Sequence, residues 1–247
     1  MCLLALAWKV HPQWSVLIAA NRDELHARES SPLHEWADGT LGGRDLEAGG
    51  TWLGVRRNGR FAALTNFRDP LDVGSQLRSR GHLVTEFLAS DLAPEAYVQL
   101  ISAQTSDFRG FNLLVGSPDC LWYVGSRAAA PHALDPGVHT LSNHVLNTPW
   151  PKTQRLHSQM EHAIGQLDPQ ALLFAALADR CQAAAADLPN TGVGRDVERM
   201  LSAAMIVSPG YGTRCSTVLG LADRRGRIEE RKWAPDGSRA GSVILEW

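Results

Sequence analysis

Long apolar runs and an excess of one charge are both missing from this sequence of 247 residues. No apolar stretch approaches the ~20 residues that a membrane-spanning helix requires, so we expect no stable membrane insertion. Lys and Arg number 24 against 26 for Asp and Glu, for a net charge of −2, which leaves no basic surface for a polyanion. Nucleic acid is therefore not an expected partner.

Cysteine is scarce and scattered, since the chain has only Cys2, Cys120, Cys181 and Cys215 and no CxxC pair. This spacing matches neither a zinc site nor a disulfide framework, so we expect no bound metal and four free thiols. Thiols persist in reducing compartments. Met1–Val10 is apolar but has no basic segment and no small-residue cleavage site, so we expect no signal peptide and a cytoplasmic protein.

Strands and helices alternate in groups along the rest of the chain. Strands are expected at 2–9, 14–20, 51–57, 60–67, 111–116, 120–125, 138–142, 216–222, 228–233 and 242–245, and helices at 81–90, 94–101, 151–167, 169–181 and 197–205. Residues 24–50 are expected as a polar connection, and Asn58-Gly59 as a type I′ turn. Hairpin-joined strands favour a layered α+β fold with antiparallel sheets. No linker or repeat interrupts the pattern, so we expect one domain over residues 1–247.

The first two strands predict a specific register. His11-Pro12-Gln13 separates two apolar runs, and Pro12 suits a turn because it cannot donate to a ladder. Antiparallel pairing about residue 12 puts partners at positions that sum to about 24. Residue 2 then lies opposite residue 22, within a residue or two.

Cys2 is a candidate nucleophile because removal of Met1 would make it the first residue. Its thiol would then lie beside a free α-amine, whose unperturbed pKa of about 7.7–8.0 allows it to act as a base near neutral pH. A thiolate with an adjacent base is what acyl transfer through a covalent intermediate requires. The alternative is that Cys2 is only a small buried residue in an edge strand.

Asn21-Arg22-Asp23-Glu24 follows a wholly apolar strand, and the predicted register brings it close to Cys2. Arg22 would favour the thiolate form of a neighbouring cysteine. Asp23 could hold the new ammonium group, and Asn21 could donate to an oxyanion or cap the following turn. The alternative is a solvated strand end followed by an Asx turn.

Seven motifs in order along nearly the whole chain resemble those of the NRDE family, whose eukaryotic members are called Transport and Golgi organisation protein 2. They are Met1-Cys2-Leu3-Leu4, Ala20-Asn21-Arg22-Asp23-Glu24, Gly49-Gly50-Thr51-Trp52-Leu53-Gly54, Ala63-Leu64-Thr65-Asn66-Phe67-Arg68, Leu141-Ser142-Asn143-His144, Thr148-Pro149-Trp150-Pro151-Lys152 and Tyr211-Gly212-Thr213-Arg214. The family is in turn similar to the N-terminal nucleophile hydrolases. This resemblance implies a four-layer αββα sandwich of two antiparallel sheets flanked by helices.

The resemblance also implies roles for individual residues. In cysteine-type N-terminal nucleophile hydrolases the first cysteine attacks an amide, and Cys2 matches it. An Arg and an Asp at the end of the second strand flank that cysteine, and Arg22 and Asp23 match them. Asparagine side chains help to form the oxyanion hole, for which Asn66 and Asn143 are the candidates. The implied reaction is hydrolysis of a non-peptide amide or an acyl thioester, and it requires no cofactor.

A late arginine supports the site in those hydrolases, and Arg214 is its candidate here. The family also implies a different function, because its eukaryotic members are discussed as factors in haem trafficking and lipid metabolism. For a haem carrier, His139 and His144 would be the first ligands to test, although each is otherwise an ordinary structural or surface histidine. The expected partner is thus a small acyl or amide substrate, or haem, and the sequence does not indicate an oligomeric state.

Overall fold

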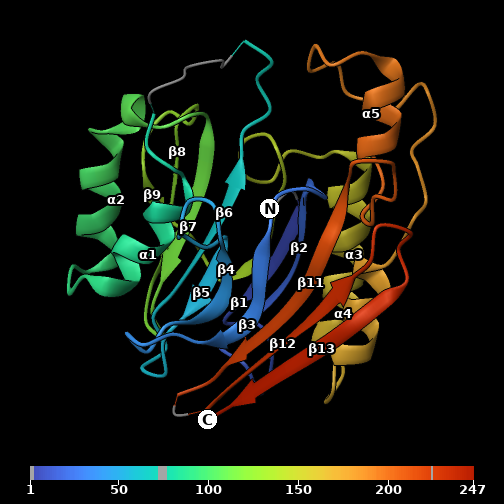
Figure 1. Cartoon of the computed structure of the whole chain (residues 1–247). Helices are drawn as coiled ribbons and strands as arrows, with labels where there is room; N and C mark the ends of the chain where they lie inside the picture. The colour runs from blue at the N-terminus through green and yellow to red at the C-terminus, as the bar shows by residue number, and fades with distance from the viewer. Residues whose placement is uncertain (1–2, 72–76, 224) are drawn as a thin grey trace.

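Two antiparallel sheets lie face to face in the computed structural model, which describes residues 3–71, 77–223 and 225–247 (Figure 1). The six-stranded sheet runs in the order β10 (Gly137–Leu141), β1 (Leu3–Trp8), β2 (Val16–Leu25), β11 (Tyr211–Leu221), β12 (Gly226–Trp233) and β13 (Arg239–Glu246). The seven-stranded sheet runs in the order β3 (Ser30–Glu35), β4 (Leu41–Asp45), β5 (Leu53–Val55), β6 (Phe61–Asn66), β7 (Phe111–Gly116), β8 (Leu121–Gly125) and β9 (His132–Ala133).

Helices cover the outer face of each sheet. On the seven-stranded sheet lie α1 (Gly81–Ala89) and α2 (Pro94–Ser102), and on the six-stranded sheet lie α3 (Pro151–Ile164) and α4 (Gln170–Leu177). The short helix α5 (Arg195–Leu201) stands above α3 in Figure 1, and a 3₁₀ turn spans Thr105–Asp107. Among the helices of the described ranges, none has both the length and the hydrophobicity to cross a bilayer.

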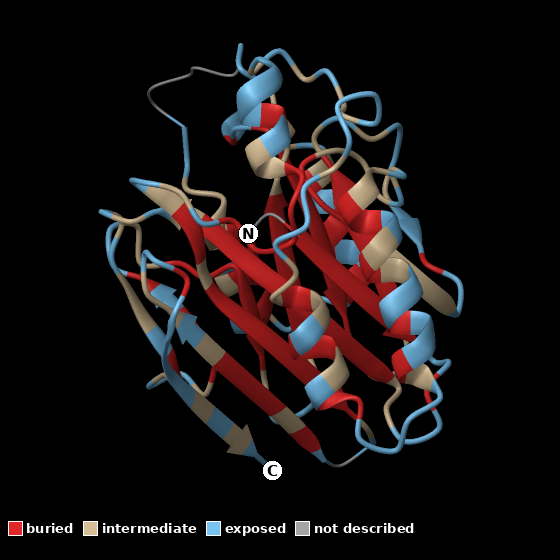
Figure 2. Ribbon diagram, turned by 90° about the vertical axis from the view of Figure 1, so that its right-hand side faces the viewer, coloured by how far each residue is buried: buried red, intermediate tan, exposed pale blue. Residues whose placement is uncertain are grey.

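Three hydrophobic clusters fill the three interfaces between these layers. Alternate residues of β1 show the arrangement, because Leu4 and Leu6 join the cluster between the sheets whereas Leu3 and Ala5 join the cluster under α3 and α4. A third cluster lies between the seven-stranded sheet and α1 and α2. The central strands are therefore buried on both faces, whereas the edge strands β3, β9 and β13 and the outer faces of the helices are partly or largely exposed (Figure 2). This confirms the layered α+β fold expected from the strand and helix order, and it is the αββα sandwich that the family resemblance implies.

The predicted register of the first hairpin is confirmed. Pairing runs from Leu3 opposite Asn21 to Trp8 opposite Val16, so every pair sums to 24. Cys2 lies outside the described residues. The described chain thus begins at the point of β1 that faces the polar motif of β2.

The expected polar connection at 24–50 is wrong, because β2 continues to Leu25 and two further strands follow it. Strand β4 was not predicted because Gly42 and Gly43 lie in it, and glycine is uncommon in strands. A Cβ atom on Gly43 would lie 2.5 Å from the ring of Trp52, so packing of the tryptophan requires glycine there.

Further differences from the prediction include a turn type and the bounds of a helix and a strand. The hairpin at Asn58-Gly59 forms, but only Gly59 has a positive φ, of 86°, so the turn is not type I′. Helix α5 begins two residues earlier than expected and ends four residues earlier. Strand β11 begins at Tyr211 rather than 216, because Tyr211–Thr213 pair with the polar end of β2.

Candidate active site

Arg22 projects from β2 into the space between the two sheets, in line with Ile18 and Ala20 of the same strand. Only 3% of this residue is exposed. Its Nη2 donates to Oδ2 of Asp45 at 3.2 Å, and its guanidinium lies 4.5 Å from the ring centroid of Trp52. A buried cation is tolerated only when it is paired, and the carboxylate and the aromatic face supply that pairing.

Asp45, at the end of β4, was not predicted as a site residue. Its carboxylate accepts hydrogen bonds from Nε of Arg28 at 2.7 Å, from Nη2 of Arg28 at 3.0 Å and from the backbone N–H of Ala48 at 2.9 Å, besides the bond from Arg22. Burial raises the pKa of this carboxyl, but the hydrogen bonds from Arg28 and Ala48 and the charges of Arg28 and Arg22 outweigh it. The pKa of Asp45 therefore lies below its ordinary value. The anion holds Arg22 in place.

The Asp23 side chain is held by Thr213, a residue that the sequence analysis named only as part of a motif. Oγ1 of Thr213 donates to Oδ1 of Asp23 at 2.6 Å and accepts from the backbone N–H of Ile206 at 2.9 Å. Only 2% of Asp23 is exposed. Its carboxylate is thus fixed at the junction of β2 and β11, two residues beyond the partner of Leu3.

Arg214 stabilises the same end of β2 and does not line either cavity of the cleft described below. It lies at an irregularity in the pairing of β2 with β11, and its Nη1 donates to the backbone carbonyls of His26 at 2.6 Å and Leu25 at 3.3 Å. The arginine therefore supports the end of the strand that carries Arg22 and Asp23.

Asn21 is not available as an oxyanion donor, which corrects that part of the sequence interpretation. Its side chain is fully buried, and Nδ2 donates to the backbone carbonyls of Leu177 at 2.8 Å and Ala204 at 2.7 Å. Its Oδ1 accepts from Oγ of Ser216 at 2.6 Å. Both amide hydrogens are thus used, because residues alternate along β2 and Asn21 faces the helix layer while Arg22 faces the other sheet.

Asn66 and Asn143 are in direct contact although 77 residues separate them. Nδ2 of Asn143 donates to the backbone carbonyl of Asn66 at 3.0 Å. The segments are also tied by the N–H of Arg68, which donates to the carbonyl of Asn143 at 2.8 Å. Asn143 is 6% exposed, and both asparagines line the same cavity.

Two adjoining cavities form the cleft, and they share Asn66, Arg80 and Arg109 in their walls. The smaller, of about 260 Å³, is predominantly polar; its other lining residues are Arg22, Glu24, Arg28, Asp45, Thr51, Trp52, Leu64, Ser79 and Gly81. Arg22, Asn66 and Trp52 therefore face one space, as a site built around these residues requires.

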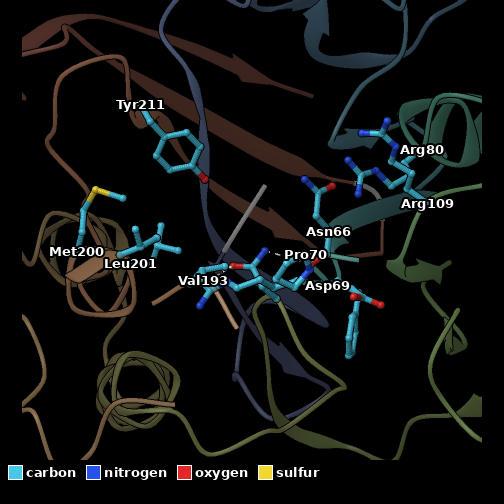
Figure 3. A pocket seen from close by; sticks show the side chains of 13 residues that line it. Asn66, Asp69, Pro70, Arg80, Arg109, Val193, Met200, Leu201 and Tyr211 are labelled. Atoms are coloured by element: carbon cyan, nitrogen blue, oxygen red, sulfur yellow. Dashed lines mark hydrogen bonds between the residues drawn. The ribbon is translucent and has the colours of Figure 1, made fainter. Parts of the chain in front are cut away.

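The larger cavity, of about 430 Å³, has one apolar and one polar side. Figure 3 shows Met200, Leu201 and Tyr211 on one side and Arg80 and Arg109 on the other. The remaining lining residues are Asn66, Phe67, Arg68, Asp69, Pro70, Asn143, Val193 and Val197. A cleft of this kind suits a ligand with an apolar part and a polar part.

A second cysteine lies near Arg22 but does not have the properties of a nucleophile. Cys215 pairs with Arg22 across β11 and β2 and is 5% exposed. Burial raises the pKa of its thiol well above the ordinary value, and the carboxyl of Glu230 raises it further. Burial also raises the pKa of Glu230, whose Oε1 accepts from the backbone N–H of Leu33 at 2.8 Å. Cys215 therefore stays a neutral thiol in the core.

The two candidate haem ligands lie on and just after β10, and neither lines the two cavities of the cleft. His139 has Nε2 at 2.9 Å from the carbonyl of Asp135 and Nδ1 at 3.3 Å from Nδ2 of Asn147, so both ring nitrogens have hydrogen-bonding neighbours. His144 uses Nδ1 on Oγ1 of Thr148 at 2.9 Å and packs on aromatic rings. No group of metal-ligating side chains occurs among the described residues.

Comparison with known sequences gives long matches. The model of the family described as Transport and Golgi organisation 2 matches residues 1–234. The Transport and Golgi organization protein 2 homolog of Homo sapiens is 35% identical over an alignment of 254 positions, gaps included. The alignment covers 92% of this chain and 91% of the relative. Its Bos taurus counterpart is 33% identical over 252 residues, with the same coverage of 92% and 91%.

Solved structures with the same fold are much more distant in sequence. A Caenorhabditis elegans ortholog of N-acylethanolamine-hydrolyzing acid amidase matches with a TM-score of 0.54 and 14% identity, over 99% of this chain and 100% of that chain. The C2A mutant of a conjugated bile acid hydrolase from Clostridium perfringens matches with a TM-score of 0.53 and 12% identity, over 99% and 92%. These likenesses identify the N-terminal nucleophile hydrolase fold.

Proposed function

This chain belongs to the Transport and Golgi organisation 2 family, and from that membership and the geometry of its cleft we propose that it is a cysteine hydrolase. Its substrate is a non-peptide amide or an acyl thioester, and Cys2 attacks it after Met1 has been removed. The observation that carries the proposal is the buried guanidinium of Arg22, which faces the smaller cavity of the cleft. Arg22 lies at the end of β2 that pairs with Leu3, and Leu3 follows Cys2 in the sequence.

The fold of these neighbours and the reactions in their names support this assignment. Both are named as enzymes that hydrolyse a substrate, one an acid amidase and the other a conjugated bile acid hydrolase. The second is a C2A mutant, so that hydrolase carries cysteine at position 2, as this chain does. A fold alone does not fix a function, and the side chains of the cleft supply the rest of the argument.

The proposed reaction has two steps. The α-amine takes the proton of the Cys2 thiol, and the thiolate adds to the acyl carbon to form a tetrahedral oxyanion. Collapse of this intermediate expels the amine or thiol, which receives the proton, and leaves a thioester on Cys2. Water activated by the same α-amine then adds to that thioester and releases the carboxylic acid and the free thiol.

Arg22, Asn143 and Asp23 act in this scheme, and neighbouring side chains hold two of them in place. Arg22 favours the thiolate by its charge, and Asp45 fixes its position. Nδ2 of Asn143 has two hydrogens, of which one is donated to Asn66, so the second is the proposed donor to the oxyanion. Asp23, held by Thr213, is proposed to orient the ammonium group of the first residue.

Substitution of Cys2 tests the function. With a panel of acyl amides and thioesters, Cys2→Ala should abolish turnover, while Cys181→Ala at the exposed cysteine should leave it unchanged. Arg22→Gln should slow acylation, because a neighbouring cation promotes thiolate formation. If the Cys2→Ala variant turns over any substrate as fast as the parent, the proposed nucleophile is wrong.

The reducing environment of the cytoplasm fits the proposed site. Cys120, Cys181 and Cys215 are free thiols, and a nucleophilic Cys2 must also stay reduced to act. We therefore propose the cytoplasm as the compartment.

Haem carriage is the alternative function, and a saturable haem titration together with no acyl adduct on Cys2 would favour it.

A further inference from the structure

We propose that Arg68 and Glu198 form a positioning pair that orients Asn143 and connects it to helix α5, which walls the larger cavity. This inference rests on the proposed hydrolase function and identifies two residues that position a group of the same site. Neither residue touches the reacting atoms in this scheme. Both act through the amide of Asn143.

Arg68 decides which way the amide of Asn143 points. Nη2 of Arg68 donates to Oδ1 of Asn143 at 3.3 Å, while Nδ2 on the other side of the amide donates to the carbonyl of Asn66 at 3.0 Å. A flipped amide would place its NH₂ group against the guanidinium and its oxygen against a carbonyl, so both contacts would become repulsive. The cation on the oxygen also polarises the amide and makes its N–H a stronger donor.

Glu198 fixes Arg68 in turn. Its Oε2 accepts from Nη1 of Arg68 at 2.8 Å, and the side chains are 3% and 11% exposed, respectively. The other oxygen, Oε1, accepts from the N–H of Thr191 at 2.7 Å and from its Oγ1 at 2.6 Å. Both carboxylate oxygens are thus bonded, which is the condition for an ion pair to be stable in a buried place.

Trp150 completes the setting of the guanidinium. The cation of Arg68 lies 5.1 Å from the ring centroid of Trp150, and this ring in turn contacts the imidazole of His144 at a centroid distance of 5.7 Å. Arginine is suited to this position because its planar group can stack on a ring while it donates to two acceptors. Lysine could not make all three contacts.

The same helix that carries Glu198 forms the apolar wall of the larger cavity, through Val197, Met200 and Leu201. A substrate whose apolar group rests on this wall contacts the helix that holds Arg68. Binding of that group therefore affects the orientation of the proposed oxyanion donor. The expected consequence is that a well-fitting apolar group raises the rate of acylation as well as the affinity.

Arg68→Lys and Glu198→Gln test the pair, with Arg57→Lys and Glu35→Gln as controls at an exposed ion pair of the same 2.8 Å separation. Arg68→Lys should lower kcat for thioester hydrolysis about tenfold to a hundredfold, as expected for a displaced catalytic group, with KM nearly unchanged. Glu198→Gln should lower kcat less, and the two control variants should match the parent. Thermal unfolding of each variant shows whether it is folded.

Alkylation of Cys2 by iodoacetamide separates positioning from a general structural role, because alkylation forms no oxyanion. The proposal predicts slower acylation and unchanged alkylation in both variants. An equal loss of acylation and alkylation, or no loss of either, would overturn it.

A second measurement is independent of activity, so failure of the hydrolase function can be told apart from failure of this inference. The side-chain amide signals of Asn143 in ¹⁵N-labelled protein, assigned with Asn143→Asp, should shift in Glu198→Gln and stay in place in Glu35→Gln. Absence of acylation in the parent would refute the hydrolase function. Unshifted Asn143 signals in Glu198→Gln would refute the positioning pair.

Discussion

Replacement of Asp45 by asparagine should destabilise the protein by removing the carboxylate that pairs with a buried guanidinium. Among the described residues, Glu24 at 4.0 Å is the only charged partner that Arg22 would keep, beside the ring of Trp52 at 4.5 Å, while 3% of the Arg22 side chain is exposed. Removing one partner of a buried ion pair costs about 3–5 kcal/mol. Arg28 is 32% exposed, so water replaces part of its interaction and the lower end, ~3 kcal/mol, is expected. For a chain of this size that loss lowers Tm by roughly 6–12 °C.

The pH dependence gives this prediction its sign. The pKa of Asp45 is depressed in the folded protein, so its contribution to stability is fully present above the ordinary value of about 3.9 and is lost as pH falls through the folded pKa. In urea titrations the difference between parent and Asp45→Asn should be constant from about pH 5 to 7 and should shrink below about pH 4. Glu35→Gln at the exposed ion pair should leave the midpoint unchanged. A difference that does not change with pH would refute the assignment to this carboxylate.

Three further predictions follow from buried polar groups. Asn21→Ala leaves two buried carbonyls without their donor and should lower the free energy of unfolding by roughly 3 kcal/mol, measured with urea, without slowing alkylation of Cys2. Burial raises the pKa of Glu230 in the folded protein, so its contribution to stability is present below the ordinary pKa and is lost as pH rises through the folded value. Glu230→Gln should therefore gain stability relative to the parent as pH rises above about 4.3, and a constant difference would contradict this. Cys215 should resist iodoacetamide at pH 7.5 until urea unfolds the protein, whereas exposed Cys181 should react at once; mass mapping of the native protein decides, and early labelling of Cys215 would contradict its burial.

Two kinds of feature were predicted well: those that a short segment determines alone, and those that the family motifs imply. The first hairpin has two uniform apolar runs and a proline turn, so its register could be calculated, and Leu3 pairs with Asn21 as expected. The proximity of Asn66 and Asn143 followed from the motifs, and the structure brings them into contact. Both belong to segments with strong strand patterns or family motifs.

Other features depend on partners that are distant in the sequence. Asp45 lies in a glycine-rich segment, and only pairing with Arg22 and Arg28 makes it part of the site. The role of Asn21 depended on which face of β2 it occupies, and its three partners come from α4, the chain after α5 and β11. Alternation along β2 would have separated Asn21 from Arg22 if the strand had been predicted to continue through the motif.

The central claim is that Cys2 is a first-residue nucleophile, and intact mass spectrometry of protein incubated with an activated acyl thioester tests it most directly. We expect a parent mass without Met1, one acyl group added per chain, and the adduct located on Cys2 by peptide mapping. Cys2→Ala should take up no acyl group, and Cys181→Ala should take up one. Retention of Met1 in active protein, or an acyl group on any residue other than Cys2, would contradict the account.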